Sequence, residues 1–285
     1  MNGIKSEWPL LVFTVCAPLC AGAWAVASLL ALIDAFPEAG SLVSGACGAA
    51  VCALLILALC CSTLHLGKPF KALRAFMRLG NSTVSNEVFM GALFAVSLIV
   101  YLAVAGSLPV SGEMGKILLA FVAAFAILFV LFQCLAYRMR TVTTWNSLAF
   151  SVEFALIALL GGVCAVGVLA CSIAFVPPEV RLGLAIAAAA SCVGMVVLVV
   201  GQGVVVAESV SMKRGAKALC ARWGALGAVR VLAVVSGSVV WGCGMLASEP
   251  MPALAGAGFV IVLAGIVIGR YAFYRSYVNV GLPRA

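Results

Sequence analysis

Long apolar stretches that recur along the 285 residues constrain this chain more than any other feature. Its residues are 65% hydrophobic and 9% charged, and the mean hydropathy is +1.25, far from the values of soluble domains. A helix of about 20 apolar residues crosses the roughly 30 Å hydrocarbon layer of a bilayer. Eight stretches meet this requirement, near residues 8–33, 45–64, 88–106, 117–137, 148–175, 183–207, 229–247 and 251–273.

Each stretch must be α-helical, because lipid offers no water to backbone N–H and C=O groups. We therefore predict an all-α integral membrane protein, a single polytopic domain over residues 1–285 built as a bundle of eight transmembrane helices. The first stretch does not resemble a cleavable signal, since it is long, follows little basic charge and precedes no small-residue cleavage site. A soluble α/β domain is excluded.

The basic residues gather on one side of the predicted membrane. Of the 17 Lys and Arg residues, 15 lie near the termini or in the loops of that side, and only Lys116 and Arg181 fall in the opposite loops, beside several acidic residues. The positive-inside bias therefore places both termini and the segment 65–87 in the cytoplasm. The net charge of +8 requires no nucleic acid partner, although a basic face can also dock an acidic subunit.

A short amphipathic segment follows the second stretch. Pro69 suits a first helical position and Gly80 a helix end, while Lys71, Arg74 and Arg78 share one face. The segment is too short and too charged to span a bilayer. We expect a short interfacial helix that binds anionic lipid headgroups.

His65 is the single histidine of the chain, and it ends the second apolar stretch. An imidazole exchanges protons near neutral pH, although it can also simply bond the last carbonyls of its helix. Ser85 is a plausible N-cap of the third stretch, with Glu87 in its first turn. Because both stretches end on the same face, His65 and Glu87 can approach each other and accept protons from a hydroxyl donor.

A third carboxylate, Glu153, lies one to two turns inside the fifth stretch. It can be a helix-start or snorkelling carboxylate, or part of a proton relay.

Cofactor motifs are missing from the sequence. The twelve cysteines include no C-x-x-C pair, so neither an iron–sulfur cluster nor a zinc site is indicated. One histidine cannot supply the axial pair of a b-type haem, and no nucleotide-binding fingerprint is present. We expect no haem, iron–sulfur cluster, molybdopterin or metal in this chain, so any electrons must pass directly to another subunit.

Several motifs occur together in one order along the chain, and the most specific are the His-Leu-Gly and Ser-Asn-Glu segments. With these motifs the chain resembles the membrane-anchor subunits of dimethyl sulfoxide reductases (the DmsC family) and, more distantly, the polysulfide and nitrite reductase anchors. The resemblance covers nearly the whole chain. The motifs are Glu7-Trp8-Pro9-Leu10, Phe13-Thr14-Val15, Ala21-Gly22, Leu64-His65-Leu66-Gly67 with Pro69, Ser85-Asn86-Glu87, Thr144-Trp145 with Ser147, Gly161-Gly162, Gln202-Gly203, and Gly269-Arg270 with Phe273-Tyr274.

The resemblance implies an eight-helix subunit of the bacterial cytoplasmic membrane that serves anaerobic respiration. It would anchor a molybdopterin catalytic subunit and a four-cluster iron–sulfur subunit, oxidise menaquinol, and pass the electrons to the nearest cluster. Dimethyl sulfoxide, other S- or N-oxides and other organic acceptors are all compatible with such an anchor, as is the reverse reaction that reduces quinone.

The resemblance also assigns the quinol site. It gives His65 and Glu87 the proton-accepting roles, with Gly67 and the basic and serine positions of the following loop around the quinol. We expect Lys71 or Arg74 to stabilise the developing negative charge, and Ser85 to line the site. The chain departs from the family pattern where Lys71, Leu73, Ala75 and Ile266 replace an arginine, an aromatic residue, a serine and a glutamate, respectively.

Two alternatives remain at this point. A passive anchor would need the basic loops but has no use for the His65–Glu87 pair. A secondary transporter would also have many helices and glycine packing such as Gly265 with Gly269. Transporters, however, usually carry polar groups near mid-membrane in repeated halves. The ionisable residues here are expected at the span ends, and no repeat is evident.

Overall fold

The computed structural model describes residues 8–64, 78–105, 112–138, 142, 144–210 and 216–275. Within these residues the chain forms helices and connecting turns without a strand, and eight helical spans are long and apolar enough to cross a membrane. The predicted fold class is thus confirmed. Most of the interfacial helix expected over 69–80 lies outside the described residues. The elements are α1 (Trp8–Leu32), α2 (Ala39–Leu42), the π-helix η1 (Val43–Cys47), α3 (Gly48–Leu64), α4 (Thr83–Val104), α5 (Glu113–Ala136), α6 (Leu148–Ser151), α7 (Glu153–Ile173), α8 (Pro178–Val210), α9 (Ala216–Leu246) and α10 (Pro252–Arg275).

Two of the eight spans are built from more than one helical segment. The second span joins α2, η1 and α3, and its interruption falls at Gly45, whose φ of −102° and ψ of −114° are not helical. Such π-helical turns inside a long helix produce local bends. The fifth span joins the single turn α6 to α7.

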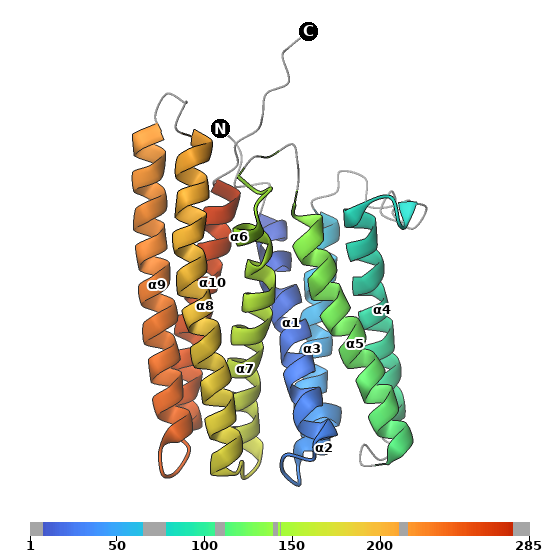
Figure 1. The fold of residues 1–285 in the computed structure, drawn as a ribbon. Helices are drawn as coiled ribbons and strands as arrows, with labels where there is room; N and C mark the ends of the chain where they lie inside the picture. The colour runs from blue at the N-terminus through green and yellow to red at the C-terminus, as the bar shows by residue number, and fades with distance from the viewer. Residues whose placement is uncertain are drawn as a thin grey trace.

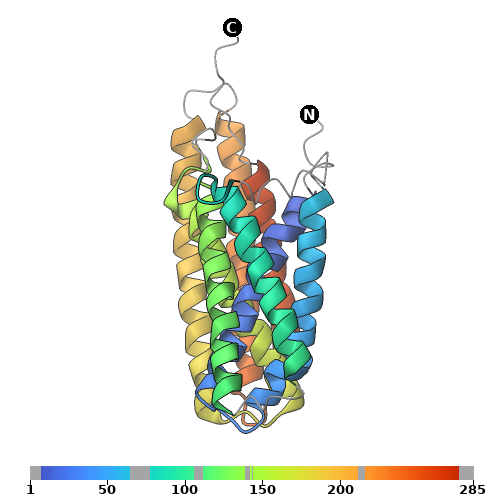
Figure 2. The same ribbon diagram turned by 90° about the vertical axis from the view of Figure 1, so that its right-hand side faces the viewer.

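Helices α1 and α7 form the centre of the bundle (Figures 1 and 2). In their most apolar windows 67% and 61% of the residues are buried, against 28–39% in the other six spans. α1 packs mainly on α7, α3 and α5, while α7 also packs on α8 and α10. The two central helices therefore connect the α3–α5 part of the bundle to the α8–α10 part.

Glycines allow α1 and α7 to approach closely. A Cβ atom built on Gly162 would lie 2.6 Å from the backbone nitrogen of Ala23, and one built on Gly22 would overlap the backbone of Ala158. Small residues at such crossings let backbones touch where lipid provides no hydrophobic drive for association. The Ala21-Gly22 and Gly161-Gly162 motifs thus lie at or beside the central helix crossing.

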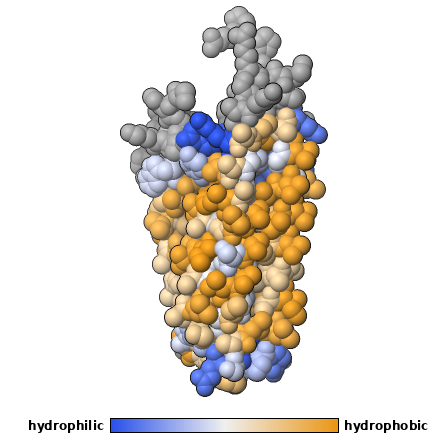
Figure 3. Space-filling view, turned by 90° about the vertical axis from the view of Figure 1, so that its left-hand side faces the viewer, coloured by the Kyte–Doolittle hydropathy of each residue, from blue (hydrophilic) through white to orange (hydrophobic). Residues whose placement is uncertain are grey.

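On the face of the bundle that Figure 3 shows, a broad apolar belt lies between polar residues at the two ends. Large apolar side chains such as Leu232 of α9, Val197 of α8 and Phe121 of α5 are exposed on the outside of the bundle. This distribution is the reverse of that on a soluble protein and matches the hydrocarbon layer of a bilayer.

The helices alternate in direction, so α1 begins, α3 ends, α4 begins and α10 ends at one end of the bundle (Figure 1). We call this the Trp8 end, and the other the Asp34 end. Two basic residues at the Asp34 end have local partners. Lys116 pairs with Asp34 at 2.5 Å, and the Arg181 guanidinium donates to the carbonyls of Met245 (2.7 Å) and Ala247 (2.8 Å) at the end of α9.

Arg230 and Arg270, which the sequence count assigned to the loops, require a correction. Both lie inside helices, in α9 and α10, and both side chains are buried. Arg78, Arg138, Arg222 and Arg275 remain exposed at the Trp8 end. The basic bias of this end therefore persists without the two buried arginines.

The central crossing gives a first prediction. The Gly22→Ala variant should lower the free energy of unfolding by about 1–3 kcal/mol, because the new methyl group must displace the α7 backbone. Gly242→Ala is the matched control, since a Cβ atom at Gly242 meets nothing within 4 Å. Thermal unfolding in detergent measures both variants. Equal stability of the two would contradict the close approach of α1 and α7.

Candidate functional site

The candidate site lies at the Trp8 end, where α3 ends at Leu64 and α4 begins at Thr83. Four of the six residues proposed from the sequence, His65, Gly67, Lys71 and Arg74, lie outside the described residues. Glu87 and Ser85 are described, and both are buried in the first turns of α4. The geometry of the site is therefore built from α4 and the helices around it.

The start of α4 differs from the prediction. Ser82, and not Ser85, is the N-cap, and its side chain accepts a hydrogen bond from the Ser85 N–H at 3.4 Å. Glu87 consequently lies in the second helical turn, beyond the positions that a helix dipole favours most. Asn86 accepts a hydrogen bond from the Gly80 N–H at 2.8 Å, and Gly80 has the left-handed φ of 80°. The Ser-Asn-Glu motif thus combines a helix start, a turn contact and a buried carboxyl group.

Glu87 is only 5% exposed and lies beside Gln133 of α5. The Glu87 Oε1 atom and both polar side-chain atoms of Gln133 are buried without a well-formed hydrogen bond in the described part of the chain. Buried polar groups in folded proteins nearly always have partners. This unused hydrogen-bonding capacity fits a hydroxyl-bearing ligand or an ordered water molecule.

A second polar group fills the interior between α7, α8, α9 and α10. The Glu153 carboxylate accepts from Arg230 at 2.7 Å, from Arg270 at 3.1 Å and from Gln202 at 3.0 Å. The Gln202 carbonyl oxygen accepts from Arg230 at 3.0 Å. We call these four side chains the Glu153 cluster. It joins four helices through side chains that are at most 3% exposed in the two ion pairs, and all four residues are buried.

Neighbouring residues shape this cluster. The Arg270 guanidinium lies between the rings of Phe154 and Phe273, 4.2 and 4.1 Å from their centroids. A Cβ atom on Gly269 would lie 2.5 Å from the Arg230 guanidinium carbon, so a larger residue there would displace the guanidinium group. Trp145 stacks on Phe273 at 4.5 Å and donates to its carbonyl at 3.2 Å. The Gly269-Arg270 and Thr144-Trp145 motifs therefore belong to one packed assembly.

The cluster corrects two expectations from the sequence. Glu153 does not snorkel to the surface, because it is fully buried in ion pairs. Ionisable residues are also not confined to span ends, since Arg230 lies well inside α9. Two cations share one carboxylate, and Arg230 Nε and Arg270 Nε and Nη2 have no hydrogen-bond partner in the described part of the chain. The Glu153 cluster thus carries a net positive charge.

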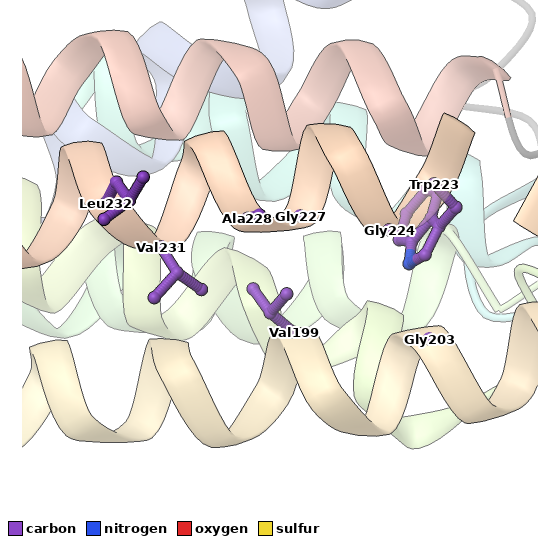
Figure 4. A pocket seen from close by; sticks show the side chains of 8 residues that line it. All are labelled: Val199, Gly203, Trp223, Gly224, Gly227, Ala228, Val231 and Leu232. Carbon is purple, nitrogen blue, oxygen red and sulfur yellow. The ribbon is translucent and has the colours of Figure 1, made fainter. Parts of the chain in front are cut away.

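An apolar groove of about 470 Å³ lies between α8 and α9 (Figure 4). It is on the opposite side of the bundle from α4, and its lining offers aliphatic groups and one indole (Figure 1). No side chain there can accept a proton, so the groove is not the site of acid–base chemistry. Its lining residues are Val199, Gly203, Trp223, Gly224, Gly227, Ala228, Val231 and Leu232.

The described residues offer no candidate metal-binding site. No group of three or more His, Cys, Asp or Glu side chains could hold an ion there, and all twelve cysteines, each of which is described, are free. Among the described residues, the polar chemistry at the Trp8 end is therefore that of carboxyl, amide, hydroxyl and guanidinium groups.

The Glu153 cluster gives a second prediction. Glu153→Gln keeps the shape but leaves two buried guanidinium groups without an anion, which should lower the free energy of unfolding by about 3–5 kcal/mol. The exposed Glu179→Gln variant serves as the control and should unfold like the unmodified protein. Thermal unfolding in detergent compares the two. Indistinguishable transitions would rule out the cluster as a stabilising element.

Comparisons with known proteins agree with the arrangement of these motifs. The family model described as DMSO reductase anchor subunit (DmsC) matches residues 1–275. The anaerobic dimethyl sulfoxide reductase subunit YnfH of Escherichia coli (strain K12) is 31% identical over 287 residues, covering 98% of each protein. A second anaerobic dimethyl sulfoxide reductase subunit of the same organism is 33% identical over 284 residues, again covering 98% of each.

A similar protein from Haemophilus influenzae, also a subunit of an anaerobic dimethyl sulfoxide reductase, is 33% identical over 165 residues, which is 57% of this chain and 58% of the relative. The matches to the family model and to the two Escherichia coli subunits span nearly every helix described above. This chain therefore belongs to the DmsC family of dimethyl sulfoxide reductase anchor subunits.

Proposed function

We propose that this chain binds menaquinol at the Trp8 end, oxidises it, and passes the electrons to an iron–sulfur subunit docked on the same end. That partner would carry four clusters and deliver the electrons to a molybdopterin catalytic subunit in anaerobic respiration. The relatives named as parts of dimethyl sulfoxide reductases support membership in such a complex.

The observation that carries the proposal is the buried carboxyl group of Glu87 with unused hydrogen-bonding capacity beside Gln133. A passive anchor needs no such group, because burying a carboxyl whose Oε1 atom has no partner costs stability. α3 also ends at Leu64, directly before His65, at the same end of the bundle. Glu87 and Leu64 therefore lie at the same end of the bundle.

The chemistry follows from what quinol oxidation releases. Each quinol gives up two electrons and two protons, and we assign one proton to His65 and the other to Glu87. Lys71 or Arg74 stabilises the negative charge that develops on the oxygen, while Gly67 and Ser85 border the ring. The electrons leave for the partner's nearest cluster, since the sequence offers no cofactor of its own.

The charge of the Trp8 end supports docking there. Arg78, Arg138, Arg222 and Arg275 are exposed at this end. A basic surface favours association with an acidic partner and steers its approach. We place this end, with both termini, in the cytoplasm on the positive-inside rule.

The quinol site gives a third prediction. In the assembled complex, His65→Ala should abolish quinol-driven turnover, and Glu87→Gln should reduce it by about 10²–10⁴-fold, because neither replacement accepts a proton. Turnover with an artificial soluble electron donor should persist in both variants. Glu113→Gln, an exposed carboxylate at the other end, is the control. Normal quinol turnover in His65→Ala would end the assignment.

Membrane orientation gives a fourth prediction. A phosphatase reporter fused at Ala285 should be inactive, because that enzyme folds only outside the cytoplasm, whereas a fusion near Glu113 should be active. A reporter that folds in the cytoplasm should give the opposite pattern at both positions. Phosphatase activity at Ala285 would reverse the proposed orientation.

A further inference from the structure

The apolar groove between α8 and α9 takes no part in the proposed function, and it lies on the opposite side of the bundle from α4 (Figure 1). We propose that this groove is a binding site for one anionic phospholipid from the leaflet at the Trp8 end. An acyl chain of the lipid lies along the groove, an ester carbonyl accepts a hydrogen bond from the Trp223 indole, and the headgroup lies at the basic start of α9.

The length of the groove matches the thickness of one leaflet. Its lining extends along α9 from Trp223 to Leu232, which at about 1.5 Å per residue is about 14 Å. One leaflet supplies about half of the roughly 30 Å hydrocarbon layer. Trp223 lies in the first turn of the membrane span Cys220–Leu246, and Leu232 lies near the middle of that span. A single acyl chain that enters from the Trp8 end would therefore follow the groove over its whole length.

Small residues leave room for such a chain. Gly224 and Gly227 lie on α9, and Gly203 lies on the α8 side (Figure 4). A Cβ atom built on Gly224 meets no atom within 4 Å, so the space beside this glycine is not filled by protein. A Cβ atom on the buried Gly227 would lie 3.3 Å from the Val199 side chain, so the two helices are in contact there. The groove thus has a closed wall of helix contacts and an open apolar space that suits an acyl chain.

Among the lining residues, Trp223 has the only polar side-chain atom. The residue is 8% exposed, and its Nε1 atom has no hydrogen-bond partner in the described part of the chain. The ring packs against Phe150 at 5.7 Å, and its nitrogen is turned toward α8, where a Cβ atom on Gly203 would lie 3.8 Å away (Figure 4). A buried N–H group nearly always has an acceptor. The ester carbonyl at the headgroup end of an acyl chain is an acceptor at the depth where membrane tryptophans reside.

The charge at this end of the groove favours an anionic lipid. Residues 211–224 contain no acidic residue and four basic ones, Lys213, Arg214, Lys217 and Arg222. The Lys217 position precedes Gly224 by about two turns of α9 and is on the same face of that helix, and Arg222 is exposed. Glu208 of α8 is exposed at the same end, and it has an interaction of its own. Basic residues at the headgroup level attract anionic lipids, each by about fivefold in affinity.

Lipid binding to the purified full-length chain tests the site. Native mass spectrometry in detergent compares added phosphatidylglycerol, which is anionic, with phosphatidylethanolamine, which is zwitterionic. The unmodified protein should bind one phosphatidylglycerol about tenfold more tightly than phosphatidylethanolamine. Gly224→Leu fills the groove and should weaken phosphatidylglycerol binding by about tenfold or more. Gly242→Leu is the matched control on the same helix, because a Cβ atom there also meets nothing within 4 Å, and it should bind normally.

Two further variants separate the contacts of the lipid. Trp223→Phe keeps an aromatic ring but removes the N–H donor, so it should weaken the binding of both lipids by about three- to tenfold. The double variant Lys217→Gln with Arg222→Gln should bind phosphatidylethanolamine as before and should lose most of the preference for phosphatidylglycerol.

A photoreactive acyl chain on phosphatidylglycerol locates the site in the unmodified protein, without any substitution. Cross-links should form at residues that line the groove. Cross-links only at other helices, or equal retention of phosphatidylglycerol by Gly224→Leu and Gly242→Leu, would overturn the proposal. Equal affinity of the unmodified protein for the two lipids would refute the selection of an anionic headgroup. Displacement of phosphatidylglycerol from the groove by menaquinone would make the groove a quinone-tail site instead.

Discussion

The pairing of Glu153 with Arg230 and Arg270 is the interaction on which the α7–α10 half of the bundle depends. Helices in lipid gain little by burying apolar faces, because the lipid tails are as apolar as the side chains. Charged groups inside the membrane are costly unless they meet partners. Glu153 meets two guanidiniums from two other helices, and Gln202 adds a fourth helix. These contacts form only when the four helices bring their side chains together at Glu153, so the cluster favours the observed placement.

The number and positions of the long helices could be predicted from the sequence, because apolar length alone decides what can cross a bilayer. Their interruptions could not. The π-turn at Gly45 and the break between α6 and α7 leave the apolar pattern unchanged. Gly22 and Gly162 stood out in the sequence only as parts of family motifs. Their role at the α1–α7 crossing needs the packing partner, which no local pattern specifies.

The candidate site was only partly predictable. Glu87 was noticed because a carboxyl group near an apolar stretch is unusual, but its helix begins earlier than the Ser85 cap implied. Gln133 was missed, since one amide in an apolar run does not tell which neighbour it faces. Arg230 was counted as a loop cation because charge counting cannot separate a span end from a buried position. Both Gln133 and Arg230 could have been found in the sequence in the same way. Each is a polar side chain inside an apolar stretch, and such side chains are costly unless they face the interior of the bundle.

The spacing of the Glu153 partners along the chain has a consequence for biosynthesis. Arg230 follows Glu153 by 77 residues and Arg270 follows it by 117, so the carboxylate leaves the ribosome long before either cation. Until α9 and α10 are inserted, α7 holds an acidic group in the bilayer without its ion pairs. The nascent subunit therefore completes the ion pairs of Glu153 only with its final helix. An arrested or truncated product that lacks α10 leaves Glu153 without its Arg270 partner within the membrane, where unpaired ionisable groups are costly.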